Sequence, residues 1–129
     1  MKIYVYKKFF LILLFISFIS SASFFSSSPE DVSLDFYTAV KNHQYDKAYD
    51  YLYIDLLPEY QDDNRYIFMK MMEREYGNNL HINSVKIIDS KQKNDRAVVL
   101  VELTSEHGTG RIKVFLANLN GEWKILKFQ

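Results

Sequence analysis

The chain has 129 residues, of which 48% are hydrophobic and 25% charged, and this balance excludes a wholly disordered protein. Sixteen basic residues balance sixteen acidic ones, so the strong positive field of a nucleic-acid-binding protein is excluded and no nucleic-acid partner is expected. Cysteine is absent, which excludes disulfides, thiolate metal sites and a cysteine nucleophile.

Residues 1–28 have the layout of a secretory signal. Lysines near the start precede an unbroken apolar run over residues 9–16, and small side chains that a signal peptidase accepts follow at residues 20–23. The alternative is an uncleaved membrane anchor, which needs about 20 mostly apolar residues. In both cases the folded part is expected to be extracytoplasmic, because the lysines stay on the inner side. We assign residues 1–28 to a signal peptide or N-terminal membrane anchor with a serine-rich lead, and residues 29–129 to one folded domain.

Three helices are predicted for the first half of the domain. The first covers residues 29–42, where Ser28 can cap the helix, proline suits its first turn, and two carboxylates face the positive end of its dipole. A second begins at Asp46 and ends before Pro58, and a third begins at Asp62 or Asp63 and ends at Gly77. Apolar residues recur at helical spacing: Val32, Phe36, Ala39 and Val40; then Ala48, Tyr49 and Leu52; then Tyr66, Met69, Met72 and Tyr76.

After Gly77 the hydrophobic period changes to two, which predicts four strands. They are expected at residues 81–89, 97–104, 111–116 and 122–128. The expected turns lie at residues 91–95 and 107–110 and at Asn120-Gly121, whose two residues both tolerate positive φ. Trp123 and Ile125 share one sheet face, so Trp123 is expected in the core beneath the helices. Three N-terminal helices followed by a four-stranded antiparallel meander predict an α+β domain.

The opening and the close of this domain resemble those of nuclear-transport-factor-2-like domains. The resemblance covers essentially all of residues 29–129 and is closest to small exported bacterial members whose function is unassigned. It implies helices packed on a strongly curved sheet, which together form a cone with a cavity. The matching motifs are structural and indicate the fold more than the function. They are Ser28-Pro29-Glu30-Asp31-Val32, residues 36–42, residues 45–49, and Asn120-Gly121-Glu122-Trp123-Lys124-Ile125.

Members that are enzymes, of the ketosteroid-isomerase type, pair a phenol on the first helix with carboxylates in the cavity. Tyr37 falls close to that phenol position. The strands offer apolar residues where a buried acid is needed, with Glu102 as the carboxylate of the central strand, and Asp55 and Glu59 lie in the loop after the second helix. We therefore expect Tyr37 to be a core tyrosine and assign no catalytic residue. A small cavity enzyme of the isomerase or dehydratase type is the alternative.

His43, His81 and His107 lie in three different segments without paired ligand spacing, so no metal and no cofactor are predicted.

A cluster of tyrosines follows the first helix. Tyr49, Tyr51 and Tyr53 lie beside three aspartates and could form a stacking surface for a glycan or a partner protein. The alternative is packing of half-buried rings at the edge between helix and sheet.

These observations predict an exported, non-catalytic binding module for a small apolar ligand or an envelope partner protein. The membrane is contacted only through the N-terminal segment if that segment stays uncleaved, and the sequence assigns no oligomeric state. A pocket between the first helix and the sheet would have apolar walls and one phenolic donor, which suits an apolar ligand held by one hydrogen bond. Its expected lining is Val32, Phe36, Tyr37, Val40, Val99, Val101 and Trp123.

The mature chain is expected to start between Ser23 and Ser28, because the small residues that follow the short apolar run suit cleavage. The measurement is the intact mass of the protein recovered from the extracytoplasmic fraction. A mass that retains residues 1–16 contradicts cleavage and favours the membrane anchor.

Overall fold

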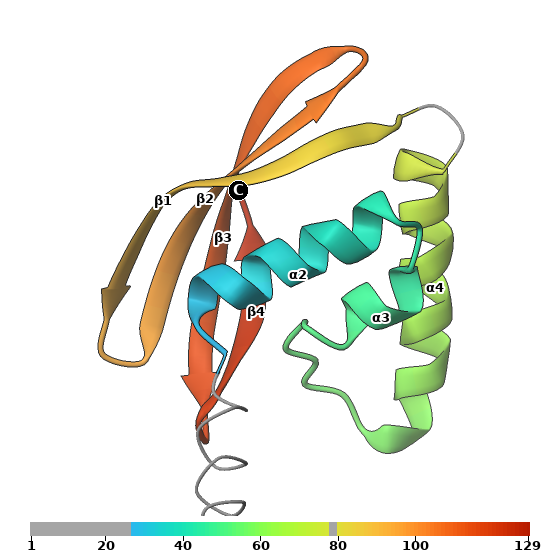
Figure 1. Ribbon diagram of the computed structural model, residues 1–129. Helices are drawn as coiled ribbons and strands as arrows, with labels where there is room; N and C mark the ends of the chain where they lie inside the picture. The colour runs from blue at the N-terminus through green and yellow to red at the C-terminus, as the bar shows by residue number, and fades with distance from the viewer. Residues whose placement is uncertain (1–26, 78–79) are drawn as a thin grey trace, which may run out of the picture.

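The structure is a computed structural model that describes residues 27–77 and 80–129. Except for Ser27 and Ser28, the expected signal peptide or anchor lies outside the described residues. The strands form one antiparallel sheet in the order β1-β2-β3-β4, so the predicted α+β class with a curved four-stranded sheet is confirmed (Figure 1). The elements are α2 (Pro29–Lys41), α3 (Tyr45–Tyr49), α4 (Pro58–Tyr76), β1 (Ile82–Lys93), β2 (Arg96–Ser105), β3 (Gly108–Leu119) and β4 (Glu122–Phe128).

Helix α2 begins as its sequence predicts. The Ser28 hydroxyl accepts a hydrogen bond from the Asp31 backbone N–H at 3.1 Å, and the Asp31 carboxylate accepts one from the Ser28 N–H at 3.3 Å. This reciprocal pair satisfies two of the backbone donors that the start of a helix leaves free. Pro29 occupies the first turn, where its fixed φ suits the helix and its missing N–H costs nothing.

The second and third helices differ from the prediction. Helix α3 has only five residues and begins at Tyr45 without a side-chain cap, one residue before the expected Asp46. Helix α4 begins at Pro58, four residues before the expected Asp62. The sequence rule that proline stops a helix is correct for the segment before Pro58, but the same residue also starts the helix that follows.

The segment from Tyr51 to Tyr53 leaves the helical conformation and pairs with the edge of the sheet. The Ile125 N–H donates to the Tyr51 carbonyl at 2.9 Å, and the Tyr53 N–H donates to the Ile125 carbonyl at 2.8 Å. Leu52 thereby forms a parallel bridge with Ile125, although its spacing predicted a place on the second helix. These bonds to β4 explain why α3 is short.

The three connections of the sheet are two-residue turns. The last one is Asn120-Gly121 as predicted, with φ of 56° and 87°, values that asparagine and glycine tolerate. The other two are shorter than predicted: residues 94–95 replace the expected turn at 91–95, and residues 106–107 replace that at 107–110. Asn94, with φ of 55°, supplies the left-handed residue of the first turn. Strands β1 and β3 are correspondingly longer than predicted.

The sheet is curved because its ladders contain irregularities. The β1–β2 register shifts between Ile87 and Asp89, and the β3–β4 register shifts between Phe115 and Leu116. An extra residue on one strand bends that strand and increases its twist. Figure 1 shows the strands bending around α2, which lies across one face of the sheet.

The core lies between α2 and the sheet. Trp123 and Ile125 are 7% and 1% exposed and belong to the same buried cluster, which confirms the face assignment. Helix α4 lies against α2 and α3, and of its side chains only Met72 is fully buried. Tyr66, which its helical spacing placed with the core residues, is instead exposed on the outer surface of α4, as is Met71. Among residues 27–77 and 80–129, no helix has both the length and the apolar character to span a membrane.

A hydrogen bond connects the start of α2 to the edge strand β1. The Ser90 hydroxyl donates to the Glu30 carboxylate, and this bond is the main reason that the pKa of Glu30 is lowered from its ordinary value of 4.5. A carboxyl group whose folded-state pKa is depressed adds stability above its unfolded pKa. That stability is lost as the pH falls through the lower folded-state pKa.

We expect Trp123→Ala to lower the free energy of unfolding by about 3–5 kcal/mol, since it removes a large ring from the buried face of β4. Denaturant titration followed by circular dichroism measures this loss. Tyr66→Ala, which truncates an exposed ring of α4, is the matched control and should cost less than about 0.5 kcal/mol. A loss under about 1 kcal/mol for Trp123→Ala would contradict the core position.

We expect Ser90→Ala to be less stable than the wild type by about 0.5–1 kcal/mol at pH 7, because the partly exposed Glu30 loses its donor. The difference should close as the pH falls below the lowered pKa of Glu30. Ser84→Ala, at an exposed serine of the same strand, is the control. A stability difference that stays constant down to the acid transition speaks against this linkage.

Candidate functional site

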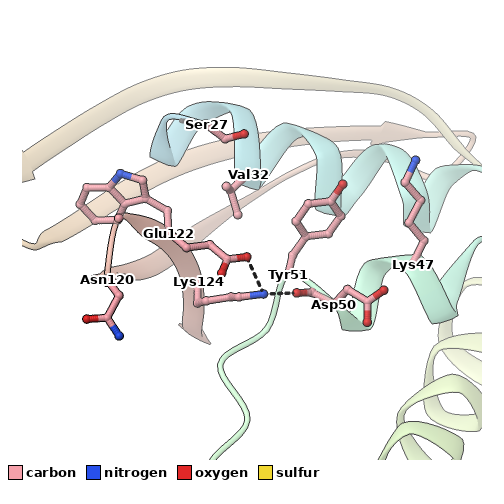
Figure 2. Close-up of a pocket in the computed structure, with 10 residues that line it drawn as sticks. Ser27, Val32, Lys47, Asp50, Tyr51, Asn120, Glu122 and Lys124 are labelled. Carbon is pink, nitrogen blue, oxygen red and sulfur yellow. Dashed lines mark hydrogen bonds and ion pairs between the residues drawn. The ribbon is translucent and has the colours of Figure 1, made fainter. Parts of the chain in front are cut away.

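A cleft lies where α2 begins, beside the end of α3 and the β3–β4 hairpin (Figure 2). Its volume is about 560 Å³. Clefts of several hundred Å³ are the usual size for ligand sites. The lining combines two lysines, two carboxylates, a phenol and an indole, and is about as apolar as it is polar: Ser27, Val32, Lys47, Asp50, Tyr51, Asn120, Gly121, Glu122, Trp123 and Lys124.

Lys124 on β4 is the central cation of this cleft. Its Nζ donates to the backbone carbonyl of Asp50 at 2.5 Å and lies 3.1 Å from Glu122 Oε1, the two interactions that Figure 2 draws as dashed lines. The first of them joins the β4 strand to the residue that follows α3. Lys124 therefore holds one wall of the cleft to the other and also places a positive charge beside the Glu122 carboxylate.

A second cleft of about 300 Å³ lies on the other side of the same charges and shares Asp50, Glu122 and Lys124 with the first. Its distinctive residue is Arg65 of α4. One guanidinium nitrogen lies 2.6 Å from Asp50 Oδ1, and the group stacks 4.5 Å above the Tyr49 ring. The hydrogen bond to Asp50 raises the pKa of Arg65. Arg65 therefore connects α4 to the rim of both clefts.

The tyrosine cluster singled out in the sequence divides between these clefts. Tyr51 lines the larger one, and Tyr49 and Tyr53 line the smaller one. Partial burial raises the pKa of the Tyr51 phenol, and the carboxylates of Asp35 and Asp50 add to the rise. Tyr51 thus stays protonated at neutral pH and can donate a hydrogen bond into the larger cleft.

The seven residues predicted to line a pocket are all buried, but only two of them reach a cleft. Val32 and Trp123 line the larger cleft. The other five are at most 3% exposed and line neither cleft; they pack against one another in the core, and a role for them in holding a ligand stays a prediction. They are Phe36, Tyr37, Val40, Val99 and Val101.

Tyr37, the phenol considered for catalysis, is enclosed by aromatic rings. The Phe36 ring centroid lies 5.0 Å away and that of Phe128 lies 6.0 Å away, both edge-on. Burial raises the pKa of Tyr37 well above the ordinary value, and Tyr76 adds to the shift. A phenol with a raised pKa stays protonated near neutral pH, so it can donate a hydrogen bond but cannot accept a proton as a base.

Two of the three histidines come together in space. The His43 and His81 rings are 6.1 Å apart, and His43 Nδ1 is hydrogen-bonded to the Tyr45 hydroxyl at 2.6 Å. His107 lies in the β2–β3 turn. In residues 27–77 and 80–129, no three His, Asp or Glu side chains gather as metal ligands would.

Sequence reasoning missed three charged residues of the site: Arg65, Glu122 and Lys124. Glu122 and Lys124 flank Trp123, and the alternation that places Trp123 in the core also places both of them on the other side of the strand. Arg65 carried no signal, because its partner Asp50 lies fifteen residues away across a loop of unpredicted shape.

Several solved structures have the same fold. A candidate NTF2-like transpeptidase from Campylobacter jejuni matches with a TM-score of 0.64 and 17% identity, over 78% of this chain and 99% of that one. A SEC-C motif containing protein from Rhodopseudomonas palustris matches with a TM-score of 0.58 and 17% identity, over 79% of this chain and 77% of that one. A DUF4783 family protein from Bacteroides ovatus matches with a TM-score of 0.52 and 11% identity, over 74% of this chain and 89% of that one.

No protein-family model matches the sequence, and no curated protein is significantly similar to it. Likenesses at these identities show the fold and not the activity. The chain has the nuclear-transport-factor-2-like fold that the resemblance implied.

Proposed function

We propose that this protein is an exported, non-catalytic binding module, and that its cleft beside the β3–β4 hairpin holds a segment of an envelope partner protein. The observation that carries the proposal is the lining of that cleft, which presents both signs of charge around an aromatic floor. Protein-binding surfaces typically combine aromatic anchors with a polar rim. Export is the inference from residues 1–28.

The geometry favours a polar partner segment over a small apolar ligand. Five of the seven residues that were expected to surround an apolar ligand line neither cleft and fill the core, so an apolar ligand among them would have to displace packed side chains. The cleft is open beforehand and offers Lys47 and Lys124 to carboxylates, Asp50 and Glu122 to cations, and Tyr51 as a donor. A peptide segment provides groups of all these kinds.

Catalysis has less support from the cleft. Acyl transfer, which the name of the Campylobacter neighbour suggests, needs an activated nucleophile next to a base. Among the residues that line the cleft, Ser27 is the one with an aliphatic hydroxyl that could act as a nucleophile. No histidine or cysteine lines the cleft to activate it or to replace it. An isomerase would need a carboxylate beside Tyr37, whose ring packs edge-on against Phe36 and Phe128.

In-cell photocrosslinking tests the proposal. A photoreactive phenylalanine analogue at Lys47, an exposed residue of the cleft, should give one specific protein adduct in cells that make the full chain. The same analogue at Lys86, an exposed lysine on β1 far from the cleft in the sheet order, is the control. We expect Lys124→Glu to reduce the Lys47 adduct about tenfold or more, as loss of a charge-assisted contact would. Lys127→Glu, on the same strand outside the cleft, should change it less than about twofold.

Three outcomes contradict the proposal. Equal adducts from Lys47 and Lys86, or none from Lys47, mean that the cleft is not the binding site. A small apolar molecule retained by the purified protein in native mass spectrometry favours the apolar ligand instead. Turnover of a ketosteroid-type substrate that falls by orders of magnitude in Tyr37→Phe favours the enzyme. Trp123 is the single tryptophan of the chain and lines the cleft, so its fluorescence reports occupancy during titration of the identified partner.

A further inference from the structure

Helix α4 has an exposed apolar stripe along its outer side. Leu57, directly before the helix, is 61% exposed, and Tyr60, Ile67 and Met71 are 56%, 62% and 47% exposed. Leu57, Tyr60, Ile67 and Met71 follow one another at steps of three, seven and four residues; Asn64, at the intervening position, turns to its own domain and donates to the Tyr49 hydroxyl at 2.8 Å. Residues at this spacing lie along one side of a helix and form the seam by which two helices pair.

The stripe is separate from the side of α4 that faces its own domain. Phe68, Met69, Met72 and Tyr76 pack towards α2 and α3 and join the core. Figure 1 shows α4 at the outer edge of the molecule, with α3 and α2 on one side of it. A helix that is apolar on a second side is expected to have a second partner, because a solvated face is normally polar.

The charges along α4 indicate what that partner is. Beside the stripe, its first half carries Asp63 and its second half carries Lys70; Glu73 and Glu75 balance Lys70 and Arg74, so the second half as a whole has no net charge. Two copies of α4 in antiparallel orientation would place Asp63 of each copy beside Lys70 of the other. A parallel pair would place carboxylates beside carboxylates, which is unfavourable.

We propose that the stripe is an isologous interface, through which a second copy of this chain pairs by antiparallel packing of α4 on α4. Tyr60 of one copy then lies opposite Met71 of the second copy, and the Ile67 side chains of the two copies lie close to the two-fold axis. Asp63 reaches Lys70 of the second copy, twice by symmetry. The ion pair that Lys70 makes with Glu73 of its own helix is 3.6 Å long and exposed, so it competes only weakly. The seam is about 20 Å long at 1.5 Å per residue.

Sedimentation equilibrium of the full chain over a wide concentration range tests the interface. A non-ionic detergent is present throughout, so that a retained N-terminal segment does not itself associate. The wild type should form a dimer, and Ile67→Glu should raise the dissociation constant at least about 100-fold, because it places two carboxylates at the centre of the seam. Ile88→Glu, at the exposed isoleucine of β1, is the matched control and should dimerise as the wild type does.

The charge pair and the orientation are tested separately. Asp63→Lys and Lys70→Asp should each weaken the dimer about threefold or more, and the double variant should restore it. Since the chain has no cysteine, Tyr60→Cys mixed with Met71→Cys should give an oxidised heterodimer, whereas Tyr60→Cys alone should give little crosslinked product. Melting curves monitored by circular dichroism identify any variant that fails to fold. If a charge variant or Ile67→Glu does not fold, crosslinking between Tyr60→Cys and Met71→Cys tests the interface instead.

A chain that stays monomeric at all concentrations overturns the proposal and leaves the stripe to a different protein. A dimer that Ile67→Glu leaves intact places the interface elsewhere. Efficient crosslinking of Tyr60→Cys with itself shows a parallel pair and contradicts the antiparallel arrangement.

Discussion

The arrangement of this protein depends on two backbone hydrogen bonds at Ile125. Its N–H donates to Tyr51 and its carbonyl accepts from Tyr53, so the chain that leaves α3 becomes a short extension of the sheet edge. The bonds have three consequences. They end α3 after five residues, they hold Asp50 next to Lys124, and they direct the chain away from the sheet before Pro58 starts α4. Without this attachment neither cleft would have its second wall.

The core is densely packed, and this determines where a ligand or partner could bind. Val99, Val101 and Val114 are completely buried under α2, and the aromatic rings of Phe36, Tyr37 and Phe128 pack at one end of it. A small domain needs such packing, because it buries a smaller fraction of its surface than a large one. Open volume is therefore left at the periphery, where charged side chains meet water. This is why the candidate site lies at the periphery and carries charged side chains, whereas the resemblance implied a cavity between the helices and the sheet.

The limited burial in a small domain also explains why α4 has an uncovered apolar side. The helix has nineteen residues, yet α2 and α3 cover only one side of it, because the sheet is occupied by α2. Its uncovered apolar side chains must face water or a partner. A pairing surface on α4 and a binding cleft beside the β3–β4 hairpin lie on different elements, with Arg65 as the residue of α4 that reaches the cleft rim. Occupancy of one surface therefore does not block the other.

The sequence determined the features that rest on local physics. The capping box at Ser28, the Asn120-Gly121 turn and the burial of Trp123 and Ile125 follow from side-chain chemistry and period within a few residues. The order of helices before an antiparallel meander, and with it the fold, followed from the same signals. The two other turns were predicted too long, because a residue at positive φ, Asn94 in the first turn and Gly108 directly after the second, closes each hairpin with fewer residues than the polar run suggested.

Tertiary structure decided what depends on contacts between distant segments. Whether Leu52 continues a helix or bridges to Ile125 is a competition between a local bond and one to a strand more than seventy residues later. Whether Val99 lines a pocket or fills the core depends on how closely α2 approaches the sheet, and Val99 is fully buried. Lys124 and Arg65 became site residues only through Asp50, which the loop after α3 brings to both. The local sequence pattern determines to which side of its helix or strand a side chain points, whereas tertiary packing determines which residues it contacts.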